Sequence, residues 1–176
     1  YQASKNGHEG EKNVMIGYQA GVSVGGHSWN KNVGIGHQTL YSLQGGSEDN
    51  VAIGDSAGFN STTVTGNTLL GSSAGVAITT GDYSVAIGYQ ALVSTNSGGS
   101  NIGIGRLSGA NNTSANSNMY IGYAAGYSNQ TGTGNTIIGN SSYAQSAVAG
   151  LNITNVTTVG NEAGYFATGS YNTFIG

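Results

Sequence analysis

The chain has no cysteine and no proline, and few of its side chains carry a charge. It contains four Lys and Arg and seven Asp and Glu among 176 residues, whereas about a quarter of a typical soluble domain is charged. The formal net charge is −3. Four cations are too few to form a basic surface that could neutralise a phosphate backbone. The sequence therefore predicts no binding to nucleic acid. The absence of cysteine is compatible with either redox compartment.

Long apolar segments are also missing. No run approaches about 18 consecutive apolar residues, and no basic segment followed by an apolar run opens the chain. We therefore expect neither membrane insertion nor a secretion signal within this sequence. Asn, Ser, Thr and Gln take the place of charge, together with 32 glycines and 11 tyrosines. Disordered chains are usually rich in charge and proline, so this composition favours an ordered structure built from a small motif.

A five-residue motif recurs along the whole chain: Asn, two variable residues, an aliphatic residue and Gly. One clear copy is Asn50-Val51-Ala52-Ile53-Gly54. Ten copies end at Gly17, Gly36, Gly54, Gly71, Gly88, Gly105, Gly122, Gly139, Gly160 and Gly176. Successive motif glycines are 19, 18, 17, 17, 17, 17, 17, 21 and 16 residues apart. A small residue, such as Ala57 or Ala74, lies three positions after each glycine and marks the register a second time.

This period predicts a parallel β-solenoid. The aliphatic residues alternate at i and i+2, which is typical of strands, and 17 residues are too few for a pair of helices or a propeller blade. The glycine content disfavours helix as well. We predict an all-β, single-domain β-roll over residues 1–176, made of about ten rungs of about 17 residues. Stacking at about 4.8 Å makes a rod roughly 45 to 50 Å long.

The repeated residues have structural roles in this prediction. The asparagines are expected to form a ladder of side-chain hydrogen bonds along the rod, and the glycines to occupy corners that need a positive φ or a close backbone approach. The structural residues are Asn13, Ile16, Gly17, Asn32, Ile35, Gly36, Asn50, Ile53, Gly54, Asn67, Leu70, Gly71, Ile87, Gly88, Asn101, Ile104, Gly105, Asn118, Ile121, Gly122, Asn135, Ile138, Gly139, Asn172, Ile175 and Gly176.

Alternation along each strand separates two faces. We expect the flanking residues, such as Val51 and Ile53, to fill the core, and the middle residue, such as Ala52, to face outward. The middle column is nevertheless apolar: Met15, Gly34, Ala52, Leu69, Ala86, Gly103, Tyr120, Ile137, Thr158 and Phe174. A strand that is apolar on both faces is normally buried on both. The middle column is therefore expected to pack against other copies of the chain, and tolerated exposure is the alternative.

Aromatic side chains are the candidate contacts for a ligand. Tyr18, Tyr89 and Tyr123 come directly after a motif glycine, and Tyr41, Tyr127 and Tyr165 lie four residues later. Aromatic rings on an uncharged polar surface can stack on sugar rings, so these residues are candidates for contact with a surface glycan; packing at the corners or between chains is the alternative. Trp29 is a further candidate for an exposed contact.

No constellation predicts catalysis or a cofactor. His8, His27 and His37 lie in different phases of the repeat, and Asp55 and Asp82 do not recur in register, so no metal site is expected. Ser residues abound, but no His and Asp accompany them in a repeated arrangement. The chain is predicted not to be an enzyme. Ice binding through Thr68, Thr136, Thr157 and Thr173 is disfavoured because that position is expected to point inward.

The repeats resemble those of known fibres. Asn50-Val51-Ala52-Ile53-Gly54-Asp55-Ser56-Ala57 resembles the head repeats of trimeric autotransporter adhesins, and the units around Tyr123 to Gly139 look similar to repeats of bacteriophage tail fibres. The resemblance implies a left-handed β-roll, a homotrimer, and a virion or cell-surface location where the chain contacts a glycan or protein receptor. Adhesin heads usually have slightly shorter repeats. The sequence thus predicts an extracellular attachment fibre; the alternative is a purely structural filament without a receptor.

Both ends of the sequence fall at the same phase of the repeat. Tyr1-Gln2-Ala3-Ser4 matches the residues that come directly after a motif glycine in other units, and Gly176 is itself a motif glycine. The sequence is therefore interpreted as a segment of a longer fibre, or as a subunit that stacks head to tail into a polymer.

Overall fold

The computed structural model describes residues 10–22, 28–143 and 152–176. It contains ten strands of three residues, each formed by the three residues before a motif glycine. The strands are β1 (Val14–Ile16), β2 (Val33–Ile35), β3 (Val51–Ile53), β4 (Thr68–Leu70), β5 (Val85–Ile87), β6 (Ile102–Ile104), β7 (Met119–Ile121), β8 (Thr136–Ile138), β9 (Thr157–Val159) and β10 (Thr173–Ile175).

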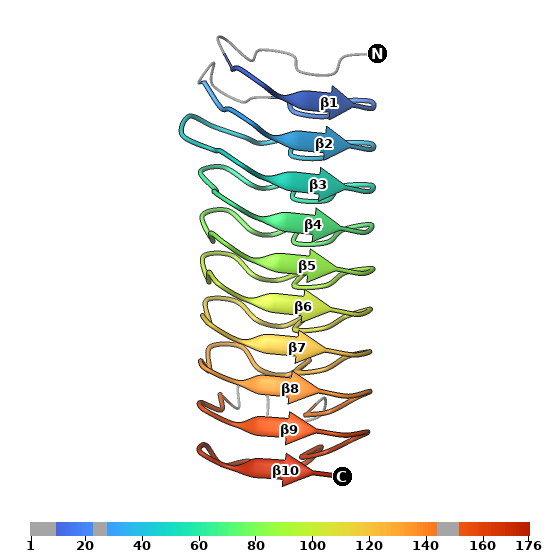
Figure 1. The fold of residues 1–176 in the computed structure, drawn as a ribbon, viewed down its shortest axis with the longest axis vertical. Helices are drawn as coiled ribbons and strands as arrows, with labels where there is room; N and C mark the ends of the chain where they lie inside the picture. Colours follow the sequence, from blue (N-terminus) through green and yellow to red (C-terminus); the bar gives the residue numbers. More distant parts are fainter. Residues whose placement is uncertain (1–9, 23–27, 144–151) are drawn as a thin grey trace.

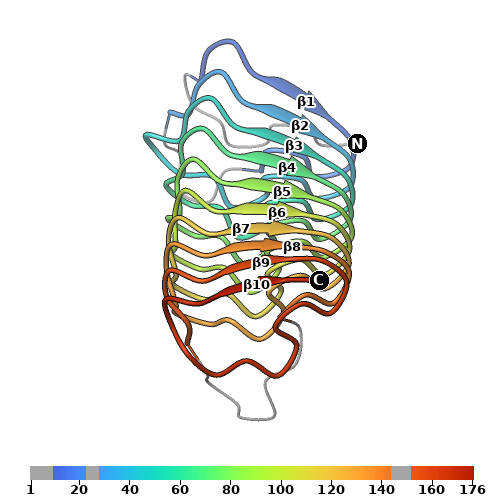
Figure 2. The ribbon, with the colours of Figure 1, turned by 60° about the horizontal axis from the view of Figure 1, so that its bottom comes forward.

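All ten strands belong to one parallel sheet in chain order, so each strand pairs with the next copy of the motif. The register joins like positions; Val51, Ala52 and Ile53 pair with Thr68, Leu69 and Leu70. Figure 1 shows the sheet along one side of a rod, and Figure 2 shows how the return segments close each rung. In both views the chain winds as a left-handed coil from β1 to β10. The predicted all-β solenoid with rungs of about 17 residues is confirmed.

The prediction of which strand face is buried was wrong. The middle residue of each strand points into the coil: Ala52, Leu69, Ala86, Tyr120 and Ile137 are fully buried. The flanking residues face outward. Alternation establishes that neighbouring residues lie on opposite faces, but it does not say which face is inside. The middle column therefore cannot contact other copies of the chain.

Packing inside the coil explains why the size of the middle residue varies so widely. A narrow interior has no room for large side chains in every rung, so a large residue in one rung is matched by a small one nearby. A Cβ on Gly103 would lie 2.7 Å from Cγ of Leu92, and a Cβ on Gly34 would lie 2.6 Å from Sδ of Met15. The far wall contributes Leu40, Leu43, Val64, Ile78 and Leu92 to the same core.

The motif asparagines form the predicted ladder, on the inner face. Asn50 is buried; its Oδ1 accepts a hydrogen bond from the backbone N–H of Asn67 at 2.9 Å, and its Nδ2 donates to the carbonyl of Val64 across the coil at 2.8 Å. The amide also donates to Oδ1 of Asn32 at 2.8 Å. The ladder thus joins adjacent rungs and ties the strand to the return segment. In the fifth rung Ser84 takes the place of asparagine, and its Oγ accepts a hydrogen bond from the N–H of Asn101. The ladder ends in the ninth rung, where the N–H of Val156 donates to Oδ1 of Asn135.

The motif glycine is required by the corner at the end of each strand. From Gly17 to Gly160 its φ lies between 124° and 136°, a region that side chains avoid. At Gly88 an added Cβ would lie 2.8 Å from the carbonyl oxygen of Gly105, the corresponding residue of the next rung. The corner therefore excludes a side chain both by its backbone conformation and by the stacking of the rungs.

Candidate functional site

The outer side of the sheet is largely apolar, and one of its two columns is aliphatic in every rung. It presents two columns, the residues on either side of each buried middle residue, which we call the apolar face. The first column is Val14, Val33, Val51, Thr68, Val85, Ile102, Met119, Thr136, Thr157 and Thr173; the second is Ile16, Ile35, Ile53, Leu70, Ile87, Ile104, Ile121, Ile138, Val159 and Ile175.

These side chains are partly or largely exposed. Ile16 is 57% exposed, Ile53 40% and Ile175 72%, and most of the others are half-buried. Twenty such side chains leave a surface on the order of 1,000 Å², larger than the few hundred Å² typical of the largest apolar patch on a monomeric protein. The four threonines of the first column also face outward. Thr136, Thr157 and Thr173 are paired in the last three rungs, whereas Val85, Ile102 and Met119 separate Thr68 from them, so the threonine row does not extend along the rod.

One edge of the apolar face is lined by the residue after each motif glycine, which we call the corner column. Its described members are Tyr18, His37, Asp55, Ser72, Tyr89, Arg106, Tyr123, Asn140 and Asn161. Because the rungs are in register, neighbouring members contact one another. The ring of Tyr18 is stacked on that of His37, with centroids 5.6 Å apart, and Nδ1 of His37 lies 2.7 Å from Oδ1 of Asp55.

Further along the corner column, Arg106 lies between two tyrosines. Its Cζ is 6.0 Å from the ring centroid of Tyr89 and 5.5 Å from that of Tyr123. These distances are typical of cation–π contacts. Both tyrosines remain about half exposed, at 49% and 46%, and Arg106 is exposed.

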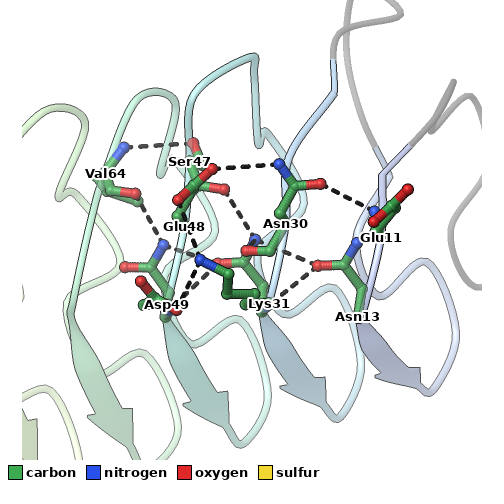
Figure 3. Close-up of polar contacts among 10 residues, drawn as sticks. Glu11, Asn13, Asn30, Lys31, Ser47, Glu48, Asp49 and Val64 are labelled. Atoms are coloured by element: carbon green, nitrogen blue, oxygen red, sulfur yellow. Dashed lines mark hydrogen bonds and ion pairs between the residues drawn. The ribbon is translucent and has the colours of Figure 1, made fainter.

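The opposite edge of the apolar face carries the charged residues of the first rungs (Figure 3). Nζ of Lys31 lies 3.6 Å from Oε2 of Glu48 and 3.9 Å from Oδ1 of Asp49. Asn30 donates to Oε1 of Glu48 at 3.2 Å, and this hydrogen bond, together with the nearby Lys31, lowers the pKa of the Glu48 carboxyl. Glu11, Lys12, Ser28, Asn30, Lys31 and Glu48 line an open cavity of about 320 Å³. Lys31 and Glu48 form an ion pair in its wall, and Lys12 and Glu11 add one charge of each sign, so the cavity presents no dominant sign to a ligand.

The predicted aromatic contacts fall into three groups. Tyr18, Tyr89 and Tyr123 are half-exposed in the corner column, as described above. Tyr127 is 36% exposed on the return side. Tyr41 is stacked on Phe59, with centroids 4.9 Å apart, and Tyr165 packs edge-on against Phe166 at 4.8 Å; both are half-buried.

The expectation for Trp29 was wrong. Trp29 is 1% exposed and belongs to the core, so it cannot contact a ligand at the surface. It fills the interior beside Gly21, where an added Cβ would lie 3.1 Å from the indole ring. Its carbonyl accepts a hydrogen bond from Nδ2 of Asn13 at 2.9 Å. For a single large apolar residue in a polar loop, the sequence does not show whether the side chain points into the core or towards solvent.

Sequence reasoning missed Arg106 as a possible functional residue. The available signal was its position in the same column as Tyr89 and Tyr123, one rung from each. His8 and His27 lie outside the described residues. Within the described ranges, no group of three or more His, Cys, Asp or Glu residues is placed to hold a metal ion. In the same ranges, no helix has the length and apolar character needed to cross a membrane.

Comparisons with models of protein families, with curated proteins and with solved structures found no match to this chain.

Proposed function

We propose that this chain is a structural and adhesive segment of an extracellular fibre, of the phage tail-fibre or bacterial surface-adhesin type, in which three copies associate through their apolar faces. The observation that carries the proposal is the apolar face itself, which continues over ten rungs. In this proposal the chain has no catalytic role and needs no cofactor.

A second copy of the chain is the partner that fits this surface best. Its side chains recur at the spacing of the rungs, so only a partner with the same spacing can pack against every rung. A parallel neighbour meets this requirement over the full length of the rod. The apolar face is two columns wide and is bordered by polar residues, so three apolar faces around one axis can exclude water from both columns. Two apolar faces packed against each other would leave the outer parts of the columns exposed to water.

An adhesive role is supported by the rest of the surface. It is rich in Asn, Ser and Thr, almost free of charge, and carries exposed tyrosines such as Tyr89 and Tyr127. Such a surface suits contact with glycans or with a protein receptor on a cell. The alternative proposal is a purely structural filament whose subunits stack head to tail, in which the outer edge of β10 pairs with the next copy.

The test of the assembly is the mass in solution by light scattering over a concentration series. A constant mass near three times 17.6 kDa supports the trimer. Ile87→Glu, in the middle of the apolar face, is expected to yield single chains, whereas Ser114→Glu, on the exposed return side, leaves the mass unchanged. A wild-type monomer refutes the trimer, and a mass that grows with concentration favours the head-to-tail filament.

The adhesive part of the proposal needs a separate measurement. The trimer, fluorescently labelled, is applied to bacterial cells and to a glycan array. Saturable binding supports a receptor-binding fibre, while a protein that associates only with itself supports the purely structural filament.

A further inference from the structure

The corner column contains a guanidinium that lies within 6.0 Å of two aromatic ring centroids, one from each neighbouring rung. Tyr89, Arg106 and Tyr123 come after the motif glycines of three consecutive rungs, and the parallel register of β5, β6 and β7 stacks them. The two rings restrict the side-chain motion of Arg106, which an isolated surface arginine would otherwise retain. Less conformational entropy is therefore lost when the guanidinium binds a ligand.

The N–H groups at the edge of this guanidinium have no acidic partner in the described part of the chain. In the described ranges the ion pairs involve Lys31 and His37, and none involves Arg106. The acidic member of the same column is Asp55, three rungs away, and its carboxylate is engaged by His37 at 2.7 Å. A fixed guanidinium with unused donors matches the two oxygens of a carboxylate, which it can bind through two parallel hydrogen bonds.

The surroundings favour a sugar that carries this carboxylate over a simple anion. The two tyrosines are about half exposed and offer ring edges and hydroxyl groups on either side of Arg106. Ser72 and Asn140, the next members of the column at either end, add uncharged hydrogen-bonding groups. The net charge of −3 disfavours a highly charged polyanion.

We propose that Tyr89, Arg106 and Tyr123 form a binding site for the carboxylate of an acidic saccharide, such as a uronic acid unit of a surface glycan. The inference rests on the proposed adhesive function and names the class of ligand. The site lies at the edge of the apolar face rather than within it, because the motif glycine separates it from the second apolar column. It therefore remains at the rim when three copies associate.

The test is a titration of the wild-type assembly with glucuronate, monitored by NMR of the aromatic and guanidinium signals. Glucose serves as the matched sugar without a carboxylate, and acetate as the carboxylate without a sugar. We expect glucuronate to shift the signals of Tyr89, Tyr123 and Arg106 and to bind at least tenfold more tightly than either control. Arg106→Lys keeps the charge but loses the planar fork, and it should weaken binding about tenfold or more. Lys12→Gln removes a cation elsewhere and should leave binding unchanged.

Any one of the following results would overturn the inference. Equal binding of glucose would remove the role of the carboxylate, and equal binding of acetate would remove the role of the sugar. Equal binding by Arg106→Lys, or equal weakening by Lys12→Gln, would show only a general attraction between charges. Absence of glucuronate binding together with a loss of trimer mass in Arg106→Gln would assign Arg106 to a contact between copies. A titration that shows no binding by an intact trimer refutes the saccharide site but not the trimer. Failure of the binding-site proposal can therefore be distinguished from failure of the assembly proposal.

Discussion

Leu69 and Leu70 are neighbours in β4 and point to opposite sides of the sheet, so they test directly which face is the core. Leu69 is fully buried between the two walls of the coil, whereas Leu70 is half-buried on the apolar face. Each is replaced by alanine, so the two variants lose the same atoms and differ only in the side of the sheet from which they are lost.

The cost at Leu69 depends on its surroundings. The Leu→Ala change removes roughly 80–100 Å² of buried apolar surface, or about 2–2.5 kcal/mol at about 25 cal/mol per Å². The cavity adds about 1–2 kcal/mol, because the walls around it relax only in part. Part of those walls is backbone: the Cα positions of Gly58 and Gly75 are so close that an added Cβ would lie 2.8 Å from a methyl carbon of Leu69. We expect Leu69→Ala to lower the free energy of unfolding by about 3–4.5 kcal/mol.

The cost at Leu70 should be much smaller in an isolated chain, about 1 kcal/mol or less, because its side chain is already partly in water. The measurement is urea unfolding monitored by circular dichroism, at a concentration at which light scattering gives single chains. Equal denaturant slopes are required so that the midpoints can be compared. If Leu70→Ala cost as much as Leu69→Ala, or more, the assignment of the inner and outer faces would be wrong.

Three further changes test the interior and the corners, each by denaturant unfolding against its control. Asn50→Ala leaves two buried backbone groups without their side-chain partner and should cost about 2–4 kcal/mol, against less than about 0.5 for the exposed Asn60→Ala; similar costs would contradict the ladder. Gly88→Ala should lower the free energy of unfolding by more than about 3 kcal/mol, because its φ is 128° and an added Cβ would clash with the adjacent rung. Gly46→Ala is the control and should cost less, because no atom lies within 4 Å of an added Cβ. The opposite order would refute the steric role of the corner. Burial raises the pKa of Tyr143 to about 12, from about 10 in the unfolded chain. The stabilisation linked to this shift is therefore complete below pH 10, and the free energy of unfolding falls by about 1.4 kcal/mol per pH unit as the pH rises towards 12. Tyr143→Phe should reduce this fall between about pH 10 and 12, and an unchanged pH profile would show that Tyr143 does not cause it.

The repeat could be read from the sequence because the chain enforces it residue by residue. A glycine is needed at every corner, and an asparagine can bond to its copy only if the copies are in phase. A strict interval from Gly54 to Gly139 therefore leaves no other arrangement than stacked rungs. The all-β solenoid, the strand positions and the asparagine ladder are all consequences of that periodicity.

The tertiary structure decided what lies inside. Alternation places Ala52 and Ile53 on opposite faces, but the closed coil holds only one of the two. The residues of the middle column, whose sizes range from glycine to tyrosine, fill the interior together with the asparagines. The burial of Trp29 and the position of Arg106 between two tyrosines likewise depend on neighbours about 17 residues away. The sequence by itself determined the repeat and its phase, because these are properties of the backbone. Only the tertiary structure decided the faces, because these depend on how side chains of neighbouring rungs fill a shared volume.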